Sequence, residues 1–347
     1  MKKIPNEDLD HIFQNNQDIW ESFRGKSIFL TGGTGFFGKW LLESFIYVNE
    51  KLNLSAKVTT LTRNPESFIN EHPFYNDYLK SVRFVKGDIL NFDFNFNEKF
   101  DFIIHAATDA SDALIKENPL LMMDTITIGT RKILDFAKTQ KLIGFLYISS
   151  GAVYGRQPED IESIKEIDFY NIDINNPNSA YAEGKRIAEL YCSTYSKQYK
   201  IPIKIARCFA FVGPYLPLDT HFAIGNFIRN IINNENIIIK GDGTTIRSYM
   251  YSSDLTTWLW KILILGEENY PYNVGSDEQV TVLDLAKKIK KMNLESNLIV
   301  QGAKAHFIDK YIPNIERSNK LGLLINVNLT NAIEKTYSFN KNKNKNL

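Results

Sequence analysis

Short apolar runs alternate with helix-like patterns from residue 26 onward. The apolar runs lie at residues 27–31, 57–61, 82–88, 100–107, 145–150 and 203–209. The segments between several of them carry apolar side chains at three- and four-residue spacing, at 38–52, 120–140 and 180–198. Strands that alternate with helices predict βαβ units with right-handed crossovers, and therefore a mainly parallel sheet. The nearly unbroken apolar runs are typical of strands buried on both faces.

The pattern changes at both ends of this alternating region. Residues 6–24 carry apolar side chains at helical spacing, which predicts an amphipathic helix ahead of the first strand. Beyond about residue 210, prolines interrupt the alternation, and helices near 221–234 and 281–292 alternate with short strands. The residues from 340 to the end are polar and of low complexity, so they cannot bury apolar area.

These changes predict two domains. We expect the first at residues 1–210, built of the N-terminal helix and a doubly wound parallel α/β sheet, with a returning segment near 246–262. A smaller α/β domain is expected at 211–339, followed by a disordered tail at 340–347.

Composition excludes several classes of protein. The 347 residues are 44% apolar and 23% charged, as in soluble globular proteins. The 41 basic and 40 acidic residues leave a net charge of +1, which gives no electrostatic footprint for nucleic acid or an anionic membrane. Cys192 and Cys208 are too few for a disulfide framework or a zinc site, so we expect no metal. With no signal peptide and no apolar stretch of about 20 residues, we expect a cytoplasmic protein.

A glycine-rich turn, TGGTGFFG at residues 31–38, lies between a predicted strand and a predicted helix. Its spacing fits both G-x-G-x-x-G and G-x-x-G-x-x-G, which let the backbone approach a pyrophosphate at the helix N-terminus. A tight turn with no ligand is the plain alternative, but the strand, the helix and a third strand ending in Gly-Asp favour a Rossmann-type dinucleotide site. The residues expected to contact the cofactor here are Gly32, Gly35, Phe36, Phe37 and Gly38.

The end of the second predicted strand bears on the choice of cofactor. An NAD site places Asp or Glu there for the ribose 2′-hydroxyl, whereas an NADP site places Arg near the 2′-phosphate. Here the chain has Arg63, and no acid occurs until Glu66. We therefore favour NADP(H), with NAD(H) possible, over the alternative that Arg63 is a solvated loop residue.

A second motif, Y-x-x-x-K, is formed by Tyr181 and Lys185 at the start of a predicted helix. Residues four apart share one helical face, so the ammonium can approach the phenol and lower its pKa. Upstream, Ser149 and Ser150 follow a buried strand and offer hydroxyls to a substrate oxygen. An exposed Tyr and Lys are the plain alternative, but the order of these motifs after a dinucleotide turn favours catalysis.

Together these motifs resemble the extended short-chain dehydrogenase/reductase family, specifically its nucleotide-sugar epimerases, dehydratases and reductases. The similarity covers roughly residues 26–335 and includes TGGTGFFG, GDIL, HAAT, SSGAVYG, YAEGK, Arg207 followed by Gly213-Pro214, GDGTTIRSYMYSSDL and YNVGS. It implies that Tyr181 is the catalytic acid/base, that Lys185 holds the nicotinamide ribose and tunes Tyr181, and that Ser150 bonds the reacting sugar oxygen. It also implies cofactor contacts by Asp88, Ile89, Ala106 and Ala107, and contacts to a nucleotide-diphosphate sugar by Asn226 and Arg247; a surface ion pair is the alternative for Arg247.

Two positions depart from this family's dehydratases, which usually carry an Asp-Glu pair directly after the residue matching Ser150. Here Gly151 and Ala152 stand there, and they can transfer no proton. We therefore favour hydride transfer at C4 of a nucleotide-diphosphate hexose, by a 4-epimerase or a 4-keto-sugar reductase. The alternative is a 4,6-dehydratase with relocated acids, such as Asp109 or Glu183. A non-catalytic dinucleotide-binding sensor is a third interpretation, but it has no need for the intact catalytic residues.

The helices predicted near 119–139 and 180–198 carry more apolar residues than one core-facing stripe needs. These residues are Leu120, Leu121, Ile126, Ile133, Leu134, Ile187, Leu190, Tyr191 and Tyr195. Relatives in this family commonly pair through such helices, so we expect a homodimer. Packing of the second stripe under the second domain is the alternative.

Overall fold

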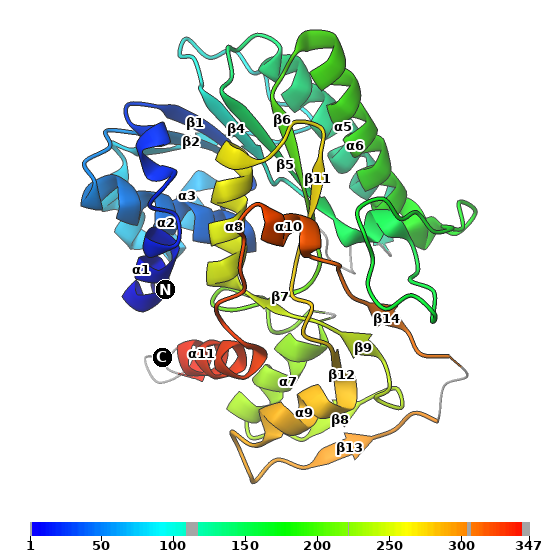
Figure 1. The fold of residues 1–347 in the computed structure, drawn as a ribbon. Helices are drawn as coiled ribbons and strands as arrows, with labels where there is room; N and C mark the ends of the chain where they lie inside the picture. The colour runs from blue at the N-terminus through cyan, green and yellow to red at the C-terminus, as the bar shows by residue number, and fades with distance from the viewer. Residues whose placement is uncertain (1, 109–116, 221, 304–306, 342–347) are drawn as a thin grey trace. The chain divides into compact units, whose positions relative to one another are not determined.

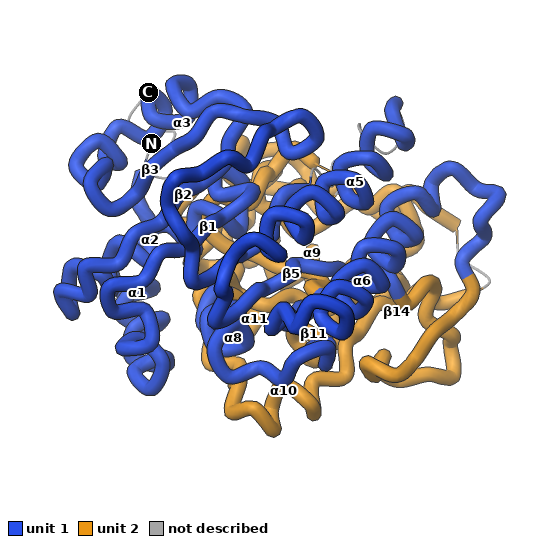
Figure 2. The backbone as a smooth tube through the Cα atoms, turned by 90° about the horizontal axis from the view of Figure 1, so that it is seen from above, with its two compact units in different colours: residues 1–153, 172–207, 256–272 blue, residues 154–171, 208–255, 273–347 orange. Residues whose placement is uncertain are grey.

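A computed structural model describes residues 2–108, 117–220, 222–303 and 307–341 (Figure 1). The chain divides into two compact units, coloured separately in Figure 2. Unit 1 consists of residues 1–153, 172–207 and 256–272, and unit 2 of residues 154–171, 208–255 and 273–347. The segment that returns to unit 1, at 256–272, overlaps the expected 246–262 and extends beyond it. The excursion at 154–171 has no counterpart in the sequence pattern.

Unit 1 is built around a seven-stranded sheet with the order β11-β6-β5-β4-β1-β2-β3. Its strands are β1 (Ser27–Thr31), β2 (Lys57–Thr62), β3 (Val82–Lys86), β4 (Phe102–His105), β5 (Gly144–Ser150), β6 (Ile203–Cys208) and β11 (Pro271–Val274). The last residue of β6 and the last two of β11 fall within the bounds of unit 2. The ladders that join β3, β2, β1, β4 and β5 are parallel. This arrangement confirms the predicted doubly wound α/β fold, and every residue of β4 and β5 is buried.

Helices flank this sheet: α2 (Phe36–Lys51), α3 (Pro65–Glu71), α5 (Pro119–Ala137), α6 (Ala180–Tyr199) and most of α8 (Ser252–Leu265). Two of them begin with the same device, an Asn cap followed by Pro. The side chain of Asn64 accepts a hydrogen bond from the Ser67 amide at 3.1 Å, and that of Asn118 does so from Leu121 at 3.1 Å. α5 and α6 pack side by side (Figure 1). No helix within the described ranges has the length and apolar character needed to cross a bilayer.

The N-terminal segment corrects the expectation of one helix over residues 6–24. Helix α1 (Asn6–Gln14) ends early, and a 3₁₀ turn, η1 (Trp20–Phe23), follows after a polar stretch. The helix ends where the Asn15 side chain bonds the His11 carbonyl at 2.8 Å, at the start of four polar residues, 15–18. The segment still covers unit 1, since Trp20 lies 5.8 Å from Trp260, measured between ring centroids.

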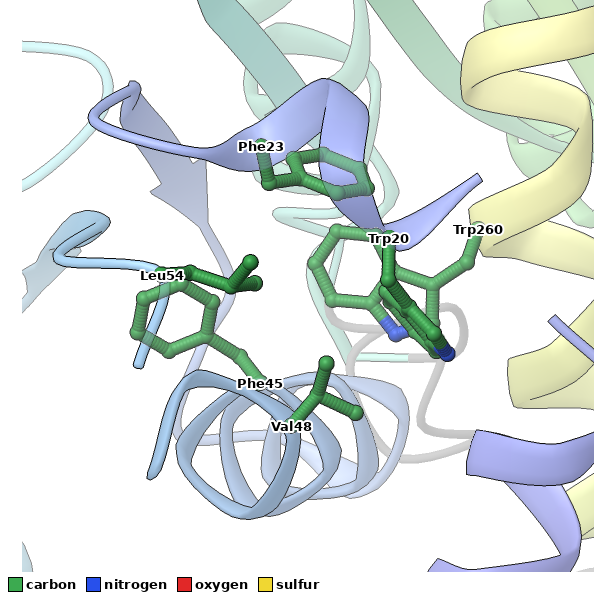
Figure 3. A pocket seen from close by; sticks show the side chains of 6 residues that line it. All are labelled: Trp20, Phe23, Phe45, Val48, Leu54 and Trp260. Atoms are coloured by element: carbon green, nitrogen blue, oxygen red, sulfur yellow. The ribbon is translucent and has the colours of Figure 1, made fainter. Parts of the chain in front are cut away.

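Figure 3 shows the small cavity that this packing leaves, with a volume of about 10 Å³. It is lined by Trp20, Phe23, Phe45, Val48, Leu54 and Trp260. That volume is roughly the space of one water molecule, and the lining side chains are apolar. The cavity is therefore a packing gap under the N-terminal segment and no candidate for a cofactor site.

The described part of unit 2 contains three small sheets. β7 (Phe211–Val212) pairs with β10 (Met250–Tyr251), β8 (Ile237–Ile239) pairs with β13 (Leu298–Val300), and β9 (Ile246–Arg247) lies between β12 (Val280–Thr281) and β14 (Lys310–Tyr311). The helices are α7 (Ala223–Ile232), α9 (Val282–Lys290), α10 (Glu316–Lys320) and α11 (Leu329–Lys341). The first two residues of the expected tail end α11, and residues 342–347 lie outside the described residues.

The buried side-chain amide of Asn273 organises part of unit 2 and binds Tyr154, a residue of the SSGAVYG motif. The Asn273 side chain accepts a hydrogen bond from the Tyr154 hydroxyl at 2.6 Å. It donates to the carbonyls of Ile164 and Asn314 at 2.8 and 3.0 Å. The backbone N–H of Asn273 donates to the Glu166 carboxylate at 3.0 Å. The Tyr of SSGAVYG and the Asn of YNVGS therefore have a structural role, because they satisfy each other in the interior.

Candidate active site

The candidate cofactor residues of unit 1 follow neighbouring parallel strands. The glycine turn follows β1, Arg63 follows β2, Asp88 lies two residues beyond β3, and Ala106 follows β4. Ser150 ends β5. Because the carboxyl ends of parallel strands meet at one edge of a sheet, these residues share that edge. The strand order reverses between β1 and β4, which is where doubly wound sheets bind their ligands.

Different surroundings favour glycine at the three positions Gly32, Gly35 and Gly38 of the turn. Gly32 has a φ of +74°, and a Cβ on it would lie 2.6 Å from the Ala106 carbonyl oxygen. A Cβ on Gly38 would lie 2.2 Å from the Gly32 carbonyl oxygen, so the fold itself requires both glycines. Gly35, the N-cap of α2, would bring its Cβ no closer than 3.3 Å to any atom. That distance, to the Gly32 carbonyl oxygen, is still a tight contact, and a glycine here also leaves the helix N-terminus open to a ligand such as a dinucleotide pyrophosphate.

The residues expected to contact the rest of the dinucleotide differ from one another in exposure and in bonding. Arg63 is exposed and makes no hydrogen bond or ion pair with the described part of the chain. The Asp88 carboxylate is half-buried and accepts a hydrogen bond from the Leu90 amide at 2.9 Å. Ile89 is buried in the core with Ile126 of α5. Phe36 and Phe37 open α2, with ring centroids 5.5 Å apart.

A buried histidine links the ends of β1 and β4. His105 Nδ1 lies 2.7 Å from Thr31 Oγ1, which also accepts a hydrogen bond from the Ala107 amide at 3.1 Å. On its other side, His105 Nε2 lies 3.1 Å from Thr130 Oγ1. Burial, and then the positive charge of Lys185, lowers the pKa of His105 to about 3. The imidazole is therefore neutral, and it fixes the loop that carries Ala106 and Ala107.

The Y-x-x-x-K pair comes together as its spacing predicts. Lys185 is 3% exposed, and its ammonium lies 6.0 Å from the centroid of the Tyr181 ring. Lys185 Nζ donates to the Ile148 carbonyl at 2.7 Å and to Thr108 Oγ1 at 3.0 Å. This contact of Thr108, the last residue of the HAAT motif, was not predicted from the sequence, because it joins residues 77 positions apart. These bonds hold the ammonium between the end of β5 and the loop after β4.

Ser150 is oriented by its own turn. Its hydroxyl oxygen accepts a hydrogen bond from the Ala152 amide at 3.1 Å, so its hydrogen is left to bond a substrate oxygen. The turn that follows, η3 (Gly151–Tyr154), carries no acid. Of the two proposed replacement acids, Glu183 is in an ion pair with Arg186 at 3.2 Å, and Asp109 lies outside the described residues.

The two candidate substrate residues of unit 2 lie on different elements. Asn226, on α7, donates to the Thr220 carbonyl at 2.7 Å. Arg247, on β9, forms an ion pair with the Asp309 carboxylate and donates to the carbonyls of Ile246 and Asp309 at 2.9 and 3.2 Å. The alternative interpretation of Arg247 as an ion-pair residue therefore describes its present contacts.

Comparison with known proteins places these motifs in a family. The model of a family described as "NAD dependent epimerase/dehydratase family" matches residues 28–275. UDP-glucuronic acid decarboxylase 6 of Arabidopsis thaliana is 30% identical over 269 residues, which cover 76% of this chain and 74% of the plant protein. dTDP-D-glucose 4,6-dehydratase of Dictyostelium discoideum is 32% identical over 285 residues, which cover 78% of this chain and 62% of that protein.

Solved structures show the same fold. UDP-glucuronic acid 4-epimerase from Bacillus cereus, in complex with UDP-glucuronic acid and NAD, matches with a TM-score of 0.77 and 23% identity. The match covers 91% of this chain and 99% of that one. UDP-glucose 4-epimerase from Thermotoga maritima, with UDP-glucose, has a TM-score of 0.77 at 20% identity, with coverage of 91% and 99%.

Proposed function

The chain belongs to the NAD dependent epimerase/dehydratase family, and we propose that it transfers a hydride at C4 of a nucleotide-diphosphate hexose. The observation that carries the proposal is the arrangement at the end of β5. Ser150 is oriented as a hydrogen-bond donor, Lys185 is held near Tyr181, and Gly151 and Ala152 provide no acid. This set of groups serves oxidation and reduction at one carbon and supplies no acid or base for elimination of water at that turn.

In the proposed mechanism, Tyr181 removes the proton of the C4 hydroxyl when the sugar is oxidised and returns it when the ketone is reduced. Lys185 stabilises the phenolate by its charge, and Ser150 donates a hydrogen bond to the same sugar oxygen. A nicotinamide dinucleotide supplies the hydride chemistry when it is bound. Gly35 and the amides that open α2 would hold its pyrophosphate, because Gly35 is the N-cap of α2 and has no side chain to block the helix N-terminus.

Two net reactions share this step. A 4-epimerase returns the hydride to the opposite face of the sugar and leaves its cofactor unchanged, whereas a 4-keto-sugar reductase consumes the reduced cofactor. A second candidate function, decarboxylation of a nucleotide-linked uronic acid, is favoured by the relatives at about 30% identity. It begins with the same C4 oxidation, because a C4 ketone places a carbonyl β to the C6 carboxylate, which can then leave as CO₂.

The test is a panel of UDP- and dTDP-hexoses, UDP-glucuronic acid and a 4-keto-6-deoxy sugar, each with NAD, NADH, NADP or NADPH. A C4 isomer without net redox change indicates epimerase, loss of the reduced-nicotinamide absorbance indicates reductase, and released CO₂ indicates decarboxylase. A 4-keto-6-deoxy product formed at ordinary rates would refute our assignment against dehydration. No turnover of any substrate would refute the proposed function.

We further propose a preference for NADP(H). The supporting observation is Arg63, which is exposed and free of other partners in the described chain at the end of the strand that reaches the adenosine ribose. The related structures from Bacillus cereus and Bordetella bronchiseptica are complexes with NAD and NADH, so the preference would set this chain apart from them.

Finally, we propose that the protein pairs with a second copy through α5 and α6. Ile126, Ile133, Leu134 and Tyr195 are buried within unit 1. Leu120, Leu121, Ile187 and Leu190, by contrast, are at least 36% exposed on the same two helices. A second copy would cover this exposed apolar face. A monomeric mass by light scattering at micromolar concentration would refute the pairing.

A further inference from the structure

A buried ion pair lies one helical turn beyond Lys185 and has no part in the chemistry proposed so far. The Glu189 carboxylate accepts hydrogen bonds from Arg207 Nε at 3.0 Å and from a terminal guanidinium nitrogen at 2.7 Å. It also accepts a hydrogen bond from the Ser149 hydroxyl at 2.5 Å. The side chains of Arg207 and Glu189 are only 5% and 12% exposed.

The burial of this pair calls for an explanation other than stability. Removing two charges from water costs several kcal/mol, and buried ion pairs often stabilise a fold no better than apolar residues of similar size. Such pairs are therefore better evidence for a fixed geometry than for a favourable energy. Here the geometry involves Ser149, which directly precedes Ser150.

The last three residues of β5 are each bound by a different group. The Ile148 carbonyl accepts from Lys185, Ser149 donates to Glu189, and Ser150 accepts from the Ala152 amide. Lys185 and Glu189 are four residues apart on α6, so they share one helical face. Helix α6 thus holds the end of β5 at two points, on either side of one peptide bond.

Arg207 also affects where Lys185 can go. Lys and Glu four residues apart on a helix attract one another. A Lys185–Glu189 pair would draw the ammonium away from the loop after β4. Here the Glu189 carboxylate binds the guanidinium of Arg207 instead. The Lys185 ammonium bonds the Ile148 carbonyl and the Thr108 hydroxyl. The Arg quoted in the sequence motif is therefore a buried support behind the site.

We propose that Ser149, held by the Glu189–Arg207 pair, is a positioning residue that fixes the orientation of Ser150. Its importance for catalysis rests on the proposed function, but its effect on geometry does not. Because the Ser150 hydroxyl accepts from the Ala152 amide, hydrogen exchange at that amide reports whether Ser150 keeps its place.

The test is Ser149→Ala in the full-length protein, with amide exchange followed by NMR or by mass spectrometry of a peptide containing residue 152. We expect exchange at Ala152 to quicken by at least about fivefold, since loss of the buried hydrogen bond frees the strand end. Ser149→Thr keeps the hydroxyl and should restore protection. Ser196→Ala is the matched control, since Ser196 is also buried on α6 and bonds Asn269 at 2.9 Å away from these motifs.

A kinetic measurement on the panel substrate provides the second readout. Ser149→Ala should lower kcat by about threefold to tenfold with KM unchanged, as expected for a group that acts on the transition state through Ser150. Unchanged exchange at Ala152 in Ser149→Ala, or an equal change in Ser196→Ala, would overturn the proposal. If exchange responds as expected but the wild type turns over no panel substrate, the proposed function fails and the positioning role stands.

Discussion

The side chains proposed for catalysis in unit 1 and those proposed for substrate binding in unit 2 are held in different ways. Lys185 is buried and bonded to the end of β5 and to the loop after β4, and Ser150 is buried and bonded to the turn that follows β5. Arg247 and Asn226 are half-buried and bonded to acceptors close by in their own unit. The groups proposed for catalysis are therefore preorganised, whereas a ligand of the unit 2 groups must replace internal partners and lose affinity in doing so.

The largest effect should come from breaking the chemistry on the preorganised side. Tyr181→Phe keeps the ring and removes the ionisable oxygen, so folding and cofactor binding should persist. Turnover should fall by about 10²–10⁴-fold, the usual contribution of a positioned acid/base. Tyr191→Phe, on the same helix, is the control and should keep full turnover. Near-wild-type turnover of Tyr181→Phe would refute the catalytic assignment.

A smaller effect is expected at the cofactor end of unit 1. Arg63→Ala should weaken NADPH binding by about tenfold to a hundredfold, the value of one charge-assisted hydrogen bond of about 1.5–3 kcal/mol. Binding of NADH should be unchanged, because NADH carries no 2′-phosphate. Fluorescence titration of both cofactors checks the prediction, and equal wild-type affinity for the two would contradict it.

The pH dependence of the free energy of unfolding tests the buried His105, which fixes the loop after β4 in unit 1. The pKa of His105 is lowered to about 3 in the folded protein, against about 6.5 when unfolded. Between these pH values the unfolded chain binds a proton that the folded chain does not. The contribution of His105 to the free energy of unfolding is therefore fully present above about pH 6.5 and is lost as the pH falls toward 3. Unfolding free energies measured by urea titration should drop by up to about 1.4 kcal/mol per pH unit from this group. His105→Gln should flatten that slope, and an unchanged slope would contradict the prediction.

The smallest effects should come from unit 2, where the candidate substrate residues are already bonded to other groups of the same unit. Arg247→Ala should raise KM for the nucleotide sugar by about tenfold with kcat unchanged, as for a residue that binds ground and transition states alike. Asp309→Asn removes the competing carboxylate and should lower KM by about threefold, since exposed ion pairs are weak. Asp284→Asn, another surface acid of unit 2, serves as the control. A change in kcat alone would place Arg247 elsewhere in the reaction.

What the sequence predicted well was local. The strands, the glycine turn and the Tyr181–Lys185 pair follow from periodicity and from spacings of a few residues. The misses involve contacts between distant segments, such as Lys185 with Thr108 and Ser149 with Glu189. The early end of α1 was missed for another reason, because apolar residues recur at helical spacing on both sides of the polar stretch at 15–18. Excursions such as 154–171 depend on buried amides like Asn273, which no periodicity reveals.

The packing of Trp20 against Trp260 has a consequence for biosynthesis. The first aromatic residue leaves the ribosome 240 residues before its partner, a wait of about 12–48 s at roughly 5–20 residues per second. During that interval the apolar faces of η1 and α2 lack their final cover. The nascent chain should therefore need a chaperone or a temporary partner at its N-terminus until α8 has been synthesised.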